Sequence, residues 1–352
     1  MLEYNATGGY KMDKVTKNEL LNRIDFPDDY YVTLVNIDSE PILRAVVESK
    51  TNLEKVLSLV KAYKKNENDF FKALDIFSKA SFSADVEKFI LSLLTDKKLI
   101  DAGLSFQYAN YLLTIPKEKS FVYEVVSKIL CSKYLQDPNL TFTIADFIVK
   151  YSTNSVNADY LYKYIMFNDL FMDLSKEEED LNKKLNRGKI VVQAKDDNHF
   201  DSVVAYLNHH MTDDEDLVLK AAKSICEAKY NPDAISCLLM YNLHYYDNPE
   251  PIFKAVELLG DTENEEATMH MYAIAHKVKL NEFALNVIQV FHDISITKKG
   301  IYSQISYGDL QFSCIGGIYD AVMENIIKTN YYKTFNSQRD GNDGVKLVRD
   351  KK

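Results

Sequence analysis

The segment Lys229-Tyr-Asn-Pro-Asp-Ala-Ile-Ser-Cys-Leu-Leu239 combines the turn chemistry and helical spacing that decide the fold. Asn231 supplies a capping side chain. Pro232 suits a first helical turn, because proline has no N–H to lose there and its φ is already helical. The same pairing recurs at Asp137-Pro138 and Asn248-Pro249. Each pair therefore predicts the start of a helix.

Helical spacing dominates the chain outward from these breaks. Apolar residues at i, i+3, i+4 and i+7 mark the buried stripe of an amphipathic helix, as at Leu53, Val56, Leu57 and Val60. A similar run follows around Phe70–Ala80. The pattern predicts further helices over 84–95, 99–114, 119–135, 139–151, 157–173, 175–187, 199–210, 214–229, 232–246, 250–259, 263–279, 281–294, 302–315 and 317–331.

Two stretches show the alternation and β-branching of strands, Tyr31–Ile37 and Lys189–Ala194. Each can equally be the end of a helix. Ser175 and Glu178 have the spacing of a capping box, which favours a helix start there.

Helix pairs recur at a regular interval in the last third of the chain. They begin near 199, 232, 263 and 300, close to the 34-residue tetratricopeptide period. Ala73, Phe77 and Ala80 reproduce the small, aromatic, small spacing of the second helix of such a repeat. We therefore predict an all-α fold, an antiparallel helix-pair (TPR-like) repeat solenoid. A nonrepetitive helical bundle is the alternative.

This fold implies four regions. They are a flexible N-terminus (1–12), N-terminal helical repeats (13–195), C-terminal TPR-like helical repeats (196–331) and a polar flexible tail (332–352). Stacked helix pairs bury a continuous core and leave a curved face that can hold an extended segment.

The chain is acidic, with a formal net charge of −10 over 352 residues. Such a field repels phosphate backbones, so we expect no nucleic-acid partner. The short basic groups are read as solvated helix faces and a terminus: Lys61, Lys64, Lys65, Lys346, Arg349, Lys351 and Lys352.

The first 25 residues have no apolar core, and no stretch of 18 uncharged apolar residues occurs. We expect a soluble cytoplasmic protein without membrane insertion. Any membrane contact would be peripheral, through a complex.

No motif for chemistry emerges. The sequence lacks the phosphate-loop, dinucleotide, nucleophile-elbow and zinc-protease signatures, and Cys131, Cys226, Cys237 and Cys314 form no C-x-x-C pair. The histidine pairs 209/210 and 270/276 are wrongly spaced to share a metal on a helix. The acidic run Asp213–Asp216 precedes a helix and is explained by capping. We predict no catalytic, cofactor or metal residue, no enzyme activity, and binding residues that the sequence leaves unknown.

Tyrosine is frequent, at 24 residues, with clusters at 160–164 and 241–246. Tyrosine offers broad contact area with a polar tip, which suits either packing between repeats or an interface.

Four segments occur in the order found in one known family: Val203–Met211, Asn231–Leu239, Leu280–Ala284 and Gly316–Glu324. Over roughly 200–330 the chain resembles the epsilon subunit of coatomer, the coat of Golgi transport vesicles. The resemblance implies a cytoplasmic, Golgi-associated peripheral protein of ER–Golgi transport. It also implies that the protein wraps an extended segment of the coatomer alpha subunit and catalyses nothing.

The leading hypothesis is thus a non-enzymatic protein-binding scaffold. Two alternatives stay open. Helix-pair repeats also read single-stranded RNA, as in organellar gene-expression factors. An all-helical enzyme with an unrecognised site would need a closed apolar pocket with convergent polar groups.

Overall fold

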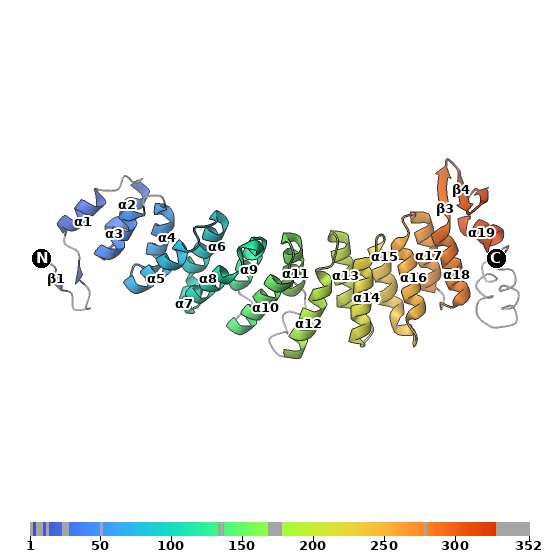
Figure 1. Cartoon of the computed structure of the whole chain (residues 1–352), viewed down its shortest axis with the longest axis horizontal. Helices are drawn as coiled ribbons and strands as arrows, with labels where there is room; N and C mark the ends of the chain where they lie inside the picture. Colours follow the sequence, from blue (N-terminus) through green and yellow to red (C-terminus); the bar gives the residue numbers. More distant parts are fainter. Residues whose placement is uncertain are drawn as a thin grey trace. The chain divides into compact units, whose positions relative to one another are not determined.

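The computed structural model describes residues 3–4, 10–11, 14–22, 28–49, 52–132, 135, 137–167, 178–277 and 280–328. Contacts within the chain divide it into two compact units, Met1–Tyr162 and Lys163–Lys352. Helices make up most of both units, and a three-stranded sheet lies near the C-terminal end of the second (Figure 1). The domain boundary expected between 195 and 196 stays a prediction.

The first unit is a series of short helices, many of them packed on the next helix or on the next but one. Two-residue strands β1 (Glu3–Tyr4) and β2 (Tyr10–Lys11) pair antiparallel, and they are the described part of the expected flexible N-terminus. The helices are α1 (Lys14–Leu21), α2 (Asp28–Val35), α3 (Glu40–Glu48), α4 (Leu53–Tyr63), α5 (Glu67–Ser78), α6 (Ala84–Thr95), α7 (Lys97–Asp101), α8 (Ser105–Thr114), the 3₁₀ helix η1 (Lys117–Val122), α9 (Tyr123–Leu130) and α10 (Pro138–Tyr151). Helix α11 (Ser155–Phe167) crosses the boundary between the units.

The second unit has longer helices, followed by the sheet. Its elements are α12 (Glu178–Val191), α13 (Asp197–His209), α14 (Glu215–Glu227), α15 (Pro232–Asn242), η3 (Leu243–Tyr245), α16 (Glu250–Asp261), α17 (Glu265–Lys277), α18 (Glu282–Asp293), β3 (Ser295–Lys299), β4 (Tyr302–Tyr307), β5 (Leu310–Cys314), α19 (Ile318–Val322) and the π-helix η4 (Met323–Ile327). The predicted tail (332–352) lies outside the described residues.

Helices α13 to α18 form two layers (Figure 1). Helices α13, α15 and α17 contact one another in order, as do α14, α16 and α18, and each helix also contacts its sequence neighbour. The core of this unit is mostly aliphatic, with the buried rings of Tyr206 and Phe291 and several buried alanines, which allow close approach. The fully buried alanines of this unit are Ala221, Ala222, Ala255 and Ala267.

At Gly260, helix α16 approaches the preceding helix pair closely. Its carbonyl accepts hydrogen bonds from the backbone N–H groups of Lys229 and Tyr230, each at 2.8 Å. A Cβ at this position would lie 3.1 Å from the Ala228 Cβ and 3.3 Å from the Ile235 side chain. Glycine therefore lets α16 sit directly on the α14–α15 connection.

The predicted helix starts are confirmed, with one difference of mechanism. Asp137 caps α10 by accepting from the Asn139 N–H at 2.9 Å, and Asn248 accepts from the Glu250 N–H at 3.1 Å. Asn231 precedes α15 with a left-handed φ of 58° and makes no side-chain cap. Ser175 lies outside the described residues.

The Asn231 side chain bonds to residues of the α16–α17 region instead of capping α15. Its amide donates to the carbonyls of Leu259 (2.9 Å) and Thr262 (2.6 Å) and to the Thr268 hydroxyl (3.2 Å). Asn231 thus joins the α14–α15 connection to the α16–α17 connection.

The prediction of a helix over 302–315 is wrong, because this segment forms strands β4 and β5. The strand order is β3-β4-β5, all antiparallel. Gly300 (φ 63°) and Gly308 (φ 54°) open two-residue turns between the strands. Positive φ at the first turn position is the signature of a tight hairpin turn and ends any helix.

Two other predictions were incomplete. The expected helix 99–114 is divided into α7 and α8 at Gly103, whose φ is 72°. The expected helix 119–135 consists of η1 and α9, which end at Leu130. The stretches Tyr31–Ile37 and Lys189–Ala194 are ends of helices α2 and α12, not strands.

Replacing Gly260 by alanine tests the close approach. We expect Gly260→Ala to lower the free energy of unfolding by about 1–2 kcal/mol, because the two backbone bonds hold Ala228 in place. In a helix interior alanine is more stable than glycine by about 1 kcal/mol. A net destabilisation would therefore mean that the steric cost exceeds this gain. Glu257→Ala, an exposed change in the same helix, should alter stability by less than about 0.5 kcal/mol. Urea denaturation measures both, and an unchanged or stabilised Gly260→Ala variant would contradict the packing described.

Candidate protein-binding groove

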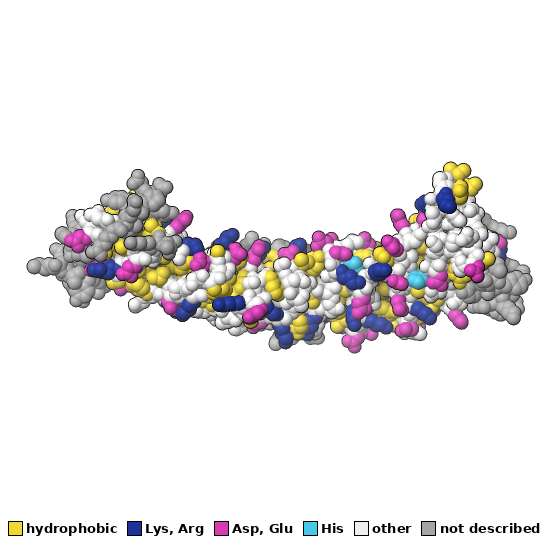
Figure 2. All heavy atoms as spheres, turned by 45° about the horizontal axis from the view of Figure 1, so that its top comes forward, with side chains coloured by type: hydrophobic (Ala, Val, Ile, Leu, Met, Phe, Trp, Pro, Cys, Tyr) yellow, Lys and Arg dark blue, Asp and Glu magenta, His cyan; other side chains and the backbone are white. Residues whose placement is uncertain are grey.

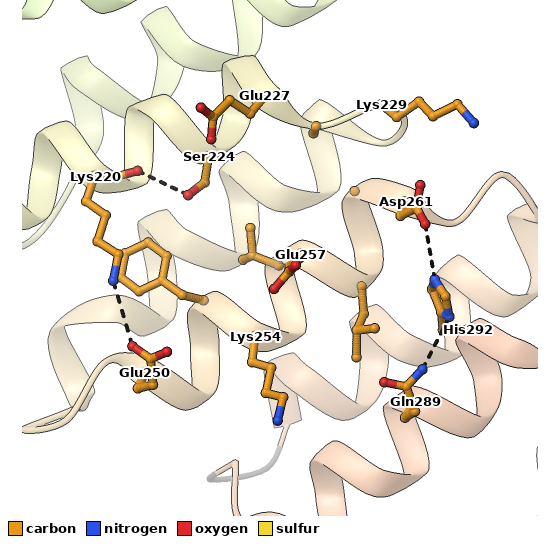
Figure 3. A pocket seen from close by; sticks show the side chains of 15 residues that line it. Lys220, Ser224, Glu227, Lys229, Glu250, Lys254, Glu257, Asp261, Gln289 and His292 are labelled. Carbon is orange, nitrogen blue, oxygen red and sulfur yellow. Dashed lines mark hydrogen bonds and ion pairs between the residues drawn. The ribbon is translucent and has the colours of Figure 1, made fainter.

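A groove of about 930 Å³ runs across the layer formed by α14, α16 and α18 (Figure 3). Residues of all three helices and of the α14–α15 connection line it: Lys220, Ser224, Glu227, Ala228, Lys229, Glu250, Phe253, Lys254, Val256, Glu257, Leu258, Gly260, Asp261, Gln289 and His292. They come from segments about 30 residues apart, which the stacking brings side by side.

The floor of the groove is small and apolar. Ala228, Phe253, Val256 and Gly260 are all buried there. The bonds from the α14–α15 connection to the Gly260 carbonyl fix the position of this floor. The groove therefore depends on the same close approach that spaces the helix pairs.

An ion pair and a cation–π contact form one end of the groove. The Lys220 ammonium lies 4.1 Å from the centroid of the Phe253 ring and 3.8 Å from the Glu250 carboxylate. Figure 3 shows Lys220 reaching from α14 toward α16. This contact presents an aromatic face covered by a positive charge.

His292, Asp261 and Gln289 form the other end. His292 Nε2 lies 3.5 Å from Asp261, and His292 Nδ1 lies 2.7 Å from Asp293. Gln289 donates to Asp293 at 2.9 Å. These contacts bring α16 and α18 together at the rim (Figure 3).

Lys254 and Glu257 project from α16 between the two ends, and both side chains are exposed (Figure 3). The whole lining holds three lysines and four carboxylates, which nearly balance. Alternating charges over an apolar floor suit a polypeptide with side chains of both signs.

A buried ionic network lies elsewhere in the second unit, around Arg187 of α12. Its guanidinium donates to both Glu215 carboxylate oxygens, at 2.8 and 2.7 Å, and to the Leu207 carbonyl at 3.2 Å. It also contacts Nε2 of His210 at 3.0 Å. Bidentate pairing of this kind is strong and directional, so it fixes α12 against α13 and α14.

The acidic run is explained by this network and by helix capping. Asp214 accepts from the Leu217 N–H at 3.1 Å and caps α14, while Glu215 pairs with Arg187. The expectation that this acidic run caps a helix is confirmed for Asp214.

The four histidines examined for metal binding do not converge. His209 is exposed at the end of α13, and His210 contacts Arg187. The His270 ring lies 5.1 Å from that of Phe291, and His276 accepts from the Asn242 amide at 2.9 Å. Among the described residues, no three His, Cys, Asp or Glu side chains gather around a shared metal position.

The two tyrosine clusters differ in burial. Tyr160 and Tyr164 are buried, at 2% and 3% exposure, whereas Tyr241 and Tyr245 are 49% and 71% exposed. Tyr246 accepts the Leu280 N–H at 3.0 Å and ties η3 to the start of α18. Lys61, Lys64 and Lys65 are exposed at the end of α4, and the basic tail residues lie outside the described chain.

Comparison with known proteins gives no family. No protein-family model, no curated protein and no solved structure matches this chain. Within the described part of the chain, no helix combines the length and apolar character needed to cross a bilayer.

The Arg187 network predicts a dependence of stability on pH. Burial, and then the positive charge of Arg187, lowers the pKa of His210 below its ordinary value. Neutral His210 can donate from Nδ1 to the Thr212 carbonyl (2.9 Å) while Nε2 accepts from Arg187. As pH falls below about 6.5, His210 is therefore protonated in the unfolded chain before it is protonated in the folded chain. The free energy of unfolding falls as a result.

We expect the free energy of unfolding to fall between about pH 7 and pH 5, and His210→Gln to flatten that slope. Glutamine retains an acceptor but does not titrate. Urea denaturation at several pH values measures the slope. Equal slopes for the two proteins would contradict the role of His210.

Proposed function

We propose that the protein is a non-enzymatic scaffold whose helix pairs form a TPR-like solenoid and whose α14/α16/α18 groove binds an extended polypeptide segment. The spacing of the second unit supports the repeat. Helices α13, α15 and α17 begin at 197, 232 and 265, intervals of 35 and 33 residues. Helices α14, α16 and α18 begin at 215, 250 and 282, intervals of 35 and 32. Both series lie close to the tetratricopeptide period.

Side-chain hydrogen bonds recur at similar separations, between 31 and 34 residues, and this observation carries the proposal furthest. The Ser236 hydroxyl donates to the Ser202 carbonyl 34 residues earlier, and Asn264 donates to the Ile296 carbonyl 32 residues later. In the first unit, the Tyr63 hydroxyl donates to the Leu94 carbonyl 31 residues later. A stack of similar units predicts such similar intervals, because each unit contacts mainly its neighbours.

The chemistry of the groove favours a polypeptide ligand over RNA. Its four carboxylates would repel phosphates, while its apolar floor and paired charges can accept side chains of both signs. We therefore propose protein binding as the function and keep RNA binding and catalysis as alternatives.

A finer proposal rests on the resemblance of residues 200–330 to coatomer epsilon subunits. On that proposal the ligand is an extended segment of the coatomer alpha subunit, and the protein acts at the cytoplasmic face of Golgi membranes.

The experiment introduces a photo-crosslinking amino acid at Glu257, in the middle of the groove, within the full-length chain. In native lysate we expect one discrete crosslinked partner, mapped to a single segment by mass spectrometry. The control position is Asp201, exposed on α13 in the other layer. Equal crosslinking from both positions would exclude the groove as the binding surface.

A charge-swapped variant then tests the recognition chemistry with the crosslinked segment as a synthetic peptide. Lys254→Glu combined with Glu257→Lys preserves net charge but reverses its order, and we expect affinity to fall about tenfold or more. The matched control, Glu40→Arg with Arg44→Glu, swaps an ion pair of α3 and should bind normally. Titrating purified coatomer alpha subunit tests the finer proposal separately.

A further inference from the structure

The two edges of the three-stranded sheet differ in how they are covered. The outer edge of β3 is covered, because Asn264 donates to the Ile296 carbonyl at 3.1 Å and Lys298 forms an ion pair with Glu266 of α17. Strand β3 also ends in two lysines, Lys298 and Lys299. Lysines and a covering element are the usual devices that stop an edge from pairing with another chain.

Among the described residues, strand β5 has none of these devices. Its sequence, Leu310-Gln-Phe-Ser-Cys314, contains no charge and no proline, and its register with β4 is unbroken from Tyr307↔Leu310 to Ser303↔Cys314. Within the described residues, no hydrogen bond joins the backbone of β5 to anything except β4. The described part of the chain therefore leaves the outer edge of β5 open for another strand.

The hairpin turn determines which backbone groups face outward. Gly308 and Asp309 form a two-residue loop closed by the Tyr307↔Leu310 pair, and such a closing pair exchanges its hydrogen bonds. Bonded and non-bonded pairs alternate along antiparallel strands. The N–H and C=O groups of Gln311 and Ser313 therefore point away from β4.

One face of the sheet is apolar up to this edge and remains partly uncovered there. Ile296, Ile305 and Phe312 are partners across the three strands; Ile296 is 9% exposed and Ile305 fully buried, while Phe312 is half-buried. On the same strand Leu310 is 44% exposed. A further strand would cover the apolar row.

We propose that β5 pairs antiparallel with β5 of a second copy of this chain about a twofold axis. Phe312 then lies opposite Phe312 of the other copy, and Leu310 lies opposite Cys314. The outward groups of Gln311 exchange backbone hydrogen bonds with those of Ser313. Aromatic cross-strand pairs of this type stabilise a sheet.

A second copy fits because the strand matches its own reverse. Read in either direction, β5 alternates apolar, polar, apolar, polar, apolar. The chain carries a net charge of −10, with acidic side chains spread over the face seen in Figure 2, which opposes contact over most surfaces, but β5 itself is uncharged. The register also sets Asp309 opposite Ile315 rather than opposite Asp309 of the other copy. No like charges therefore meet across the twofold axis.

Disulfide formation tests the register. Leu310→Cys should give a covalent dimer through Cys314 of the other copy under mild oxidation, seen on non-reducing gels. Residues 310 and 314 of one chain lie about 13 Å apart along the strand, too far to bridge each other. Adding Cys314→Ser should abolish the dimer. A dimer that persists in that double variant, or no dimer at all, would overturn the register.

Sedimentation velocity tests the association itself in the unmodified chain. We expect a monomer–dimer equilibrium that Ser313→Lys weakens at least tenfold, because lysine on an edge strand opposes pairing. Thr297→Lys, on the covered edge of the same sheet, should dimerise as the unmodified chain does. A chain that stays monomeric at all concentrations, or a Ser313→Lys variant that dimerises normally, would refute the proposal.

Discussion

The second unit depends on the hydrogen bonds that the Gly260 carbonyl accepts from the Lys229 and Tyr230 N–H groups. They require α16 to approach Ala228 so closely that only glycine fits comfortably. This contact sets the spacing between one helix pair and the next. Asn231 reinforces it from the same connection by donating to the carbonyls of Leu259 and Thr262, on either side of Gly260. The groove floor is a direct product of this spacing, so structure and proposed binding share one constraint.

The unit presents two surfaces of different chemistry. The groove has charges of both signs over an apolar floor, which suits recognition by side chains of a ligand. The β5 edge is uncharged and offers backbone groups, which suits strand pairing. Because the groove lies on α14, α16 and α18 while the edge belongs to the sheet, the two proposed interactions use different elements. Binding a partner and pairing with a second copy can thus be tested separately.

The sequence predicted the helices well because their signals are local. Asp137 and Asn248 cap helices by bonds within a few residues, and apolar spacing marks each buried stripe. The sheet was missed although Gly300 and Gly308 stand eight residues apart between alternating runs, the pattern of two tight hairpins. No comparable pattern in the sequence marks the groove. Lys220, Glu250 and His292 are brought together only by stacking, and no spacing rule within one helix connects them.

A groove that exists before its ligand requires the α14–α15 connection to be locked onto α16 in the free protein. Hydrogen exchange of the Lys229 and Tyr230 amides measures this directly, since loop amides normally exchange rapidly while locked ones open only with the surrounding structure. We predict that both amides exchange as slowly as the core amides of α16. Exchange at the rate of an exposed loop would show that the helix pairs are not held together there, and the preformed groove would have to be abandoned.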